Sequence, residues 1–152
     1  MKIYRIAQKK FIDDLSGEGA RLYGGRWNRE GDAVVYFCES LSLCVLELLT
    51  RIDFKFLTDD YYYLVVEIPD EFSRFKINPK DLPDNWRNNP PISATQDFGS
   101  RWLKLNKQFA LKIPSAVLSQ EFNYLINPNH PSASKLKVIK TGKLSLDSRV
   151  YD

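Results

Sequence analysis

Two charged side chains stand out as candidates for chemistry. Arg26 directly follows Gly24 and Gly25 and precedes Trp27, and Glu47 interrupts an otherwise apolar run. A guanidinium offers a planar fork of donors that fits phosphate or carboxylate oxygens, and glycines let backbone N–H groups approach the same anion. A carboxylate among leucines is costly unless it is paired or used. The two residues therefore indicate a site for a phosphate-bearing ligand, with a carboxylate available for catalysis.

Each of these residues also has a structural interpretation. Arg26 could be a surface arginine stacked on Trp27, and Glu47 could form a helix salt bridge with Arg51, four residues further on. Segment 24–28 is neither a Walker loop nor a GxGxxG fingerprint, so this motif alone does not establish a nucleotide site. The residue types leave both interpretations open.

Three more residues could complete such a site. Tyr36 lies in an apolar run, and its ring could stack on a flat ligand or pack in the core. Arg5 could assist Arg26 or lie in solvent at a sheet edge. Ser115 follows Pro114 and could donate a hydrogen bond to a ligand. It lacks the GxSxG elbow of a nucleophile, and nothing indicates a triad with His130.

The remaining candidates favour structural roles. His130 is the only histidine, and zinc normally takes three or four protein ligands, so no metal site is expected. His130 and Asn127 share the segment 127–131, where they could shape a turn or lie beside a pocket. Cys38 and Cys44 lie in apolar runs without zinc or redox spacing, which predicts buried free thiols in a reducing cytoplasm.

Composition is typical of one globular domain over residues 1–152. Hydrophobic residues make up 43% of the chain and charged residues 27%, with a net charge of +3. There is no Lys/Arg block that would bind nucleic acid by bulk charge. The first ten residues lack the apolar core of a signal peptide, and no apolar run approaches the roughly 18 residues of a membrane span. A cytoplasmic location is expected.

The elements that must position these residues alternate irregularly. Helices are predicted at 41–51, with Ser40 as N-cap, and at 95–105, with Thr95 as N-cap. Segment 79–92 is predicted to be a long loop, and 122–131 to be rich in turns. Strands are predicted at 1–6, 21–23, 33–38, 61–68, 72–77, 109–113, 116–118 and 136–139. Without a regular strand–helix–strand rhythm, this order predicts an α+β domain with mixed, mostly antiparallel strands and short helices.

Five segments of the chain resemble the RES domain, the toxin of a bacterial toxin–antitoxin pair. They occur in the family's order: YRI at 4–6, GGRWN at 24–28, VVYFCESLSLCVLE at 34–47, PSAV at 114–117 and EFNYLINPNHP at 121–131. The family is named after an arginine, a glutamate and a serine, which match Arg26, Glu47 and Ser115. The resemblance implies a single RES domain over 1–152, with a fold similar to ADP-ribosyltransferases.

The resemblance also implies that the protein cleaves the nicotinamide N-glycosidic bond of NAD⁺. Phosphorolysis would give ADP-ribose-1″-phosphate, and hydrolysis is the close alternative. NAD⁺ would be a substrate and not a cofactor, with inorganic phosphate as co-substrate and no metal. The implied catalytic residues are Arg26, Glu47, Tyr36 and Ser115, and the implied substrate-binding residues are Arg5, Gly24, Gly25, Trp27, Asn127 and His130.

The implied partner is an Xre-like helix-turn-helix antitoxin that covers the active site, and the family is compatible with a homodimer. Two functions from other classes remain open. The first is a mono-ADP-ribosyltransferase that uses the same pocket on a protein acceptor. The second is a non-catalytic binding module in which Arg26 and Glu47 form a structural ion pair.

Overall fold

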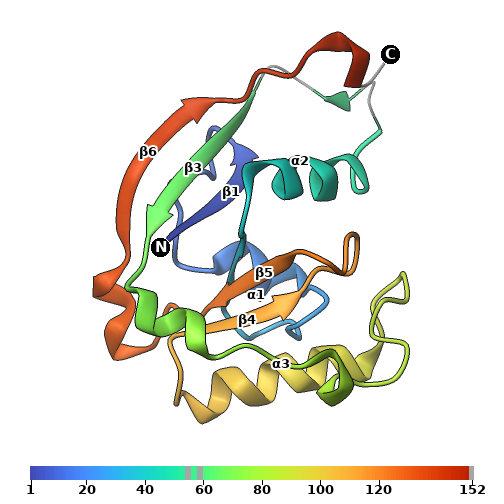
Figure 1. Cartoon of the computed structure of the whole chain (residues 1–152), viewed down its shortest axis with the longest axis vertical. Helices are drawn as coiled ribbons and strands as arrows, with labels where there is room; N and C mark the ends of the chain where they lie inside the picture. The colour runs from blue at the N-terminus through green and yellow to red at the C-terminus, as the bar shows by residue number, and fades with distance from the viewer. Residues whose placement is uncertain (54–55, 58–59, 151–152) are drawn as a thin grey trace.

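The computed structural model describes residues 1–53, 56–57 and 60–150. Within them, six strands form one sheet in the order β4–β5–β2–β1–β3–β6, and all neighbouring strands are antiparallel (Figure 1). This confirms the predicted α+β fold. The elements are β1 (Lys2–Gln8), α1 (Glu18–Tyr23), β2 (Val35–Cys38), α2 (Leu41–Leu49), β3 (Tyr61–Glu67), α3 (Ser93–Leu105), β4 (Ala110–Pro114), β5 (Phe122–Ile126) and β6 (Lys137–Lys143).

Short 3₁₀ turns complete the chain at Asp70–Arg74, Pro79–Asp81, Pro131–Lys135 and Ser148–Val150. Among the described residues, no helix has the length and apolar character needed to cross a bilayer.

The sheet opens between β1 and β2. β1 pairs with β3 along its whole length, from Lys2 opposite Glu67 to Gln8 opposite Tyr61. Its register with β2 consists of the single pair Tyr4 and Cys38. The two central strands therefore diverge, and the opening between them becomes part of the functional site.

The two faces of the sheet carry different side chains. Because alternate residues of a strand point to opposite faces, Val35 and Phe37 of β2 pack in the larger core, while Tyr36 lies on the other face. On that other face α3 covers β4 and β5, with Trp102 buried against them (Figure 1). Helix α2 packs nearby, across β1 and β2.

The helix that carries Glu47 begins as predicted. The Ser40 side chain accepts a hydrogen bond from the N–H of Leu43 at 3.1 Å, which caps α2. Leu43 and Cys44 are the residues of α2 whose side chains are buried. The helix ends at Leu49, two residues before the predicted end, and Thr50 closes it by bonding back to the carbonyl of Glu47.

Two predictions in the first half of the chain were wrong. Segment 21–23 belongs to helix α1, and Gly24 ends that helix with a φ of 69° and an N–H bond to the carbonyl of Ala20. Segment 72–77 is not a strand, because Asp70–Arg74 form a 3₁₀ turn and only Lys76 makes an isolated bridge, to Lys112.

Three further predictions failed in the second half. Residues 122–126 form strand β5, since the Asn and Pro turn signals act only after Ile126. Residues 116–118 form a turn, in which the Ser115 hydroxyl accepts hydrogen bonds from the N–H groups of Val117 and Leu118. Thr95 is not an N-cap, because α3 begins at Ser93 and the Thr95 hydroxyl donates to the carbonyl of Ile92.

Candidate active site

Two adjoining clefts lie on the face of the sheet beside α2. The smaller cleft, of about 240 Å³, lies where β1 and β2 diverge, and the larger, of about 720 Å³, lies between α1, α2 and segment 87–91. Tyr36, Glu47 and Arg51 line both clefts. The larger cleft is within the usual size range of small-molecule sites. Glu47 therefore stands at the junction of a two-part site.

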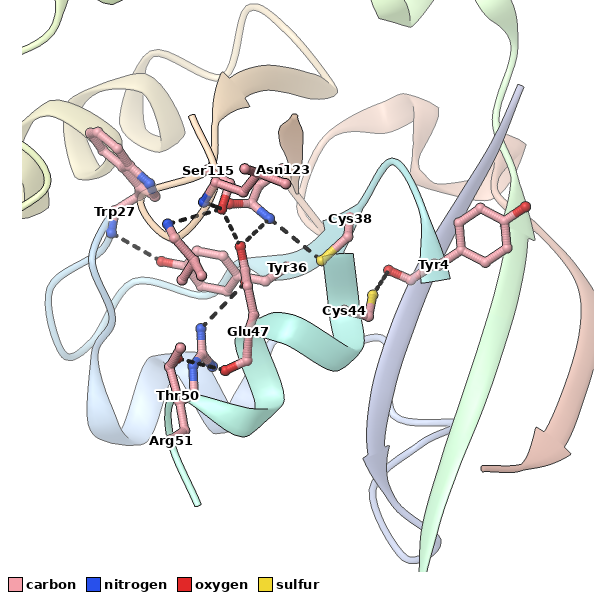
Figure 2. Close-up of polar contacts among 12 residues, drawn as sticks. Tyr4, Trp27, Tyr36, Cys38, Cys44, Glu47, Thr50, Arg51, Ser115 and Asn123 are labelled. Atoms are coloured by element: carbon pink, nitrogen blue, oxygen red, sulfur yellow. Dashed lines mark hydrogen bonds and ion pairs between the residues drawn. The ribbon is translucent and has the colours of Figure 1, made fainter. Parts of the chain in front are cut away.

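The Glu47 carboxylate is fixed by two neutral donors from the far half of the chain. Its Oε1 accepts a hydrogen bond from Ser115 Oγ at 2.8 Å and another from Asn123 Nδ2 at 2.9 Å. Figure 2 shows Glu47 extending from α2 toward these two side chains. Ser115 follows β4 and Asn123 lies on β5, so folding brings three elements onto one oxygen.

The salt bridge between Glu47 and Arg51, which was the structural alternative for Glu47, is present but loose. Arg51 Nη2 lies 3.8 Å from Glu47 Oε2, and the Arg51 side chain is 71% exposed, against 15% for Glu47. An exposed pair at this distance contributes little, because water and salt screen it. The orientation of Glu47 therefore depends mainly on Ser115 and Asn123.

Ser115 acts within the protein in this structure. It is fully buried, donates its only proton to Glu47, and accepts bonds from the N–H groups of Val117 and Leu118. It lines neither cleft. The sequence suggested a hydrogen bond from Ser115 to a ligand, and in the structure this hydroxyl donates to the Glu47 carboxylate.

The glycine turn holds Tyr36 in place. The Tyr36 hydroxyl donates to Asn28 Oδ1 at 2.7 Å and accepts from the N–H of Trp27 at 3.1 Å. A Cβ on Gly25 would lie 2.8 Å from that hydroxyl, so the close approach requires glycine. Burial raises the pKa of Tyr36, so it is a neutral hydrogen-bonding group and not a base.

Arg26 lines the larger cleft together with Glu47. Its Nη1 donates to the backbone carbonyls of Trp86 and Asn88, at 2.8 and 2.7 Å. Burial lowers the pKa of Arg26, and the charge of Arg51 lowers it further. The guanidinium is therefore anchored at one nitrogen, not stacked on the Trp27 ring as the structural alternative supposed.

Arg5 occupies the smaller cleft. Its Nη1 donates to the backbone carbonyl of Asp14, and burial lowers its pKa. It is not an edge-strand arginine in solvent, since β1 is a central strand. Each cleft thus contains an arginine, and the one carboxylate that lines both lies where they meet.

Comparison with known proteins identifies the family. The RES domain family matches residues 2–147. The chain belongs to the RES domain family. "Toxin Res" of Yersinia enterocolitica is 36% identical over 133 residues, covering 87% of each chain. "Prs ADP-ribosylating toxin" of a Sphingobium species is 38% identical over 140 residues, covering 91% of this chain and 87% of the relative.

A solved structure confirms the fold of the RES domain. The chain is similar to one in the crystal structure of the M. tuberculosis MbcT–MbcA toxin–antitoxin complex, with a TM-score of 0.76 over 99% of this chain and 86% of that one. Their sequence identity is 20%, so this likeness concerns the fold alone.

Three predicted binding residues of this RES domain contribute to the protein framework. The Trp27 side chain is buried against Trp86 and Phe98, and the residue also lines the larger cleft. Asn127 donates to Asn106 Oδ1 at 2.8 Å, and His130 Nδ1 accepts the N–H of Ser132, capping a 3₁₀ turn. Asn127 and His130 line neither cleft, so the structure does not bring them to the site.

Several residues of the site were not expected from the sequence. Asn28 and Asn123 hold Tyr36 and Glu47, and Arg87 lines the larger cleft while its Nε donates to the carbonyl of Ala116. Cys38 and Cys44, predicted as buried thiols, are buried and line the smaller cleft. Asn28 could have been found from its place in the glycine turn. Asn123 lies in the family-like segment 121–131, but its contact with Glu47 became visible only with the position of β5.

Proposed function

We propose that this RES domain is a toxin that cleaves NAD⁺ at the nicotinamide N-glycosidic bond, with inorganic phosphate as the acceptor. The observation that carries the proposal is the Glu47 carboxylate, fixed by neutral donors at the junction of two arginine-containing clefts. A negative charge held in that position suits a reaction in which positive charge develops on a sugar.

The larger cleft would receive the dinucleotide. Arg26 projects into it from the glycine turn, and its remaining N–H groups fit the oxygens of a pyrophosphate. Tyr36, whose hydroxyl is already bonded within the protein, would present its ring to the nicotinamide riboside. These contacts would place the ribose carbon beside Glu47.

The reaction would then proceed at that carbon. As the C–N bond breaks, its electron pair goes to nicotinamide, which leaves as a neutral molecule. Glu47 Oε2 stabilises the cationic sugar, and a phosphate oxygen held near Arg5 in the smaller cleft supplies the electron pair of the new C–O bond. The products are nicotinamide and ADP-ribose-1″-phosphate.

The direct experiment follows nicotinamide release by NMR. Purified protein is incubated with NAD⁺, with and without inorganic phosphate. Loss of NAD⁺ that requires phosphate supports the phosphorylase, equal loss without phosphate indicates a hydrolase, and bound NAD⁺ with no turnover indicates the binding module. Glu47→Gln keeps the shape of the side chain and removes its charge, so turnover should fall by about 10²-fold or more while the protein stays folded.

A protein acceptor is the second candidate. The Sphingobium relative is named an ADP-ribosylating toxin and is 38% identical to this chain. The same cleavage would then transfer ADP-ribose to a protein. Labelled NAD⁺ added with cell extract separates the two functions, because the label would remain on protein in one case and on a small molecule in the other.

We also propose an antitoxin partner, since the structural neighbour comes from a toxin–antitoxin complex. An Xre-like antitoxin that covers the two clefts would exclude NAD⁺ from them in the cytoplasm. Co-expression with the neighbouring reading frame and co-purification would test this, and NAD⁺ turnover by the intact complex at the rate of the free chain would contradict it.

A further inference from the structure

Asn123 contacts the key carboxylate more closely than Arg51 does. Its Nδ2 lies 2.9 Å from Glu47 Oε1, whereas Arg51 Nη2 lies 3.8 Å from Oε2. Asn123 is 9% exposed and lies on β5, opposite Cys38 of β2 and Ile113 of β4. Because strands pair on both sides of it, its backbone gives a rigid base to the side chain.

The orientation of the Asn123 amide is determined by its two acceptors. The amide nitrogen donates to Glu47 Oε1 and, more weakly, to Cys38 Sγ at 3.5 Å. A flipped amide would place its oxygen against the carboxylate, where two acceptors would repel. The nitrogen therefore faces Glu47.

Neutral donors suit the chemistry proposed for Glu47. Ser115 and Asn123 hold Oε1 without cancelling the negative charge, as a buried cation would. Oε2 accepts no hydrogen bond from the residues that the structure describes, and its only ion pair within 4 Å among them is with the exposed Arg51. One oxygen is thus used for anchoring, and the other remains for a ligand.

We propose that Asn123 is a positioning residue: its neutral amide fixes Glu47 Oε1 so that Oε2 meets the sugar carbon whose bond breaks. This inference rests on the proposed cleavage of NAD⁺. Sequence similarity alone does not suggest it, because Asn123 is not among the arginine, glutamate and serine that name the family.

Two variants test the role of the amide nitrogen. Asn123→Ala removes the side chain, and Asn123→Asp keeps its shape but replaces the donor with a second negative group beside Glu47. Both should lower kcat for nicotinamide release by about 10- to 100-fold, because a misplaced catalytic group loses about that much. Asn123 lines the larger cleft, but its amide nitrogen is bonded to Glu47, and the proposed binding groups Arg26 and Tyr36 are untouched. The KM for NAD⁺ should therefore change by only about threefold or less.

A matched control separates positioning from general destabilisation. Thr95 is fully buried, lines neither cleft and donates its hydroxyl to the carbonyl of Ile92 at 2.8 Å. Thr95→Val should lower the melting temperature and leave kcat unchanged. If Asn123→Asp retained the kcat of the wild type, the inference would be overturned.

A double-mutant cycle asks whether Asn123 acts through Glu47. In a Glu47→Gln background, Asn123→Ala should cost little further kcat, because the group that it positions has already lost its charge. Independent, multiplying losses would overturn the inference.

Side-chain amide NMR spectra test the contact between Asn123 and Glu47 independently of any reaction with NAD⁺. In the free protein, Glu47→Gln should shift the Asn123 amide resonances and leave those of Asn127, which donates to Asn106, in place. Unmoved Asn123 resonances would refute the contact whatever the reaction. If Glu47→Gln shifted the Asn123 resonances but the wild-type protein cleaved no NAD⁺, the contact would stand and its role in the reaction would be overturned.

Discussion

Replacing Ser115 with alanine would remove one of the two donors that hold Glu47. The Ser115 hydroxyl lies 2.8 Å from Glu47 Oε1 and accepts the N–H groups of Val117 and Leu118 at 3.1 and 3.3 Å. The residue is fully buried, so water cannot take the place of the hydroxyl without a rearrangement. The substitution therefore affects stability and the geometry of the carboxylate together.

The size of both effects follows from these contacts. A hydrogen bond to a charged group contributes about 1.5–3 kcal/mol, and Glu47 keeps its bond from Asn123, so the lower part of that range applies. We expect the free energy of unfolding to fall by about 1.5–2.5 kcal/mol and the melting temperature by about 3–10 °C. A loss of about 1.4 kcal/mol in transition-state stabilisation would lower kcat about tenfold.

Thermal unfolding and nicotinamide release would be measured on the same preparation. Ser119→Ala is the matched control, because Ser119 lies in the same turn and its hydroxyl makes no hydrogen bond to the described residues. If Ser115→Ala lost more activity than Glu47→Gln, Ser115 would itself take part in the chemistry. If stability fell while kcat stayed unchanged, the hydrogen bond from Ser115 to Glu47 would have no role in catalysis.

Two further predictions concern stability. A Cβ on Gly99 would lie 1.7 Å from the carbonyl oxygen of Trp27, so Gly99→Ala should lower the free energy of unfolding, measured by chemical denaturation, by about 1–3 kcal/mol. A Cβ on Gly19 would meet nothing within 4 Å, so Gly19→Ala should leave this free energy unchanged or raise it by up to about 1 kcal/mol. Contact with the Cys44 thiol and burial raise the pKa of Cys38, so this thiol stays protonated in the folded chain above about pH 8.5, where the unfolded chain ionises. The free energy of unfolding should therefore fall as pH rises through that range, by up to about 1.4 kcal/mol per pH unit from this group, and Cys38→Ala should reduce the slope.

Local signals in the sequence predict much of the fold. The β-branched and aromatic runs correctly predict β2 and β3, and Ser40 correctly marks the start of α2. The cost of an unpaired carboxylate in an apolar helix singles out Glu47, and the adjacent glycines single out Arg26. The structure places both side chains at the clefts.

Partners distant in sequence could not be predicted. Ser115 and Asn123 are 68 and 76 residues from Glu47, and no local pattern states which polar group will meet a given carboxylate. Asn123 was also hard to place because the Asn and Pro residues that follow β5 predict turns, and this signal outweighed the strand propensity of residues 122–126. Asn127 and His130 were expected from the same segment as binding residues. In the structure their side chains accept backbone N–H groups of its turns, and their part in binding stays a prediction.

The weak pairing of β1 with β2 accounts for both the smaller cleft and the position of Glu47. If the two strands paired along their length as β1 and β3 do, the smaller cleft that holds Arg5 would close. Helix α2 anchors itself beside that opening, where Leu43 is buried and the Cys44 thiol contacts the carbonyl of Tyr4 at 3.2 Å. Glu47, one turn further along α2, thereby reaches the junction of the clefts. The interruption in the sheet thus both makes room for a ligand and seats the helix that supplies the carboxylate.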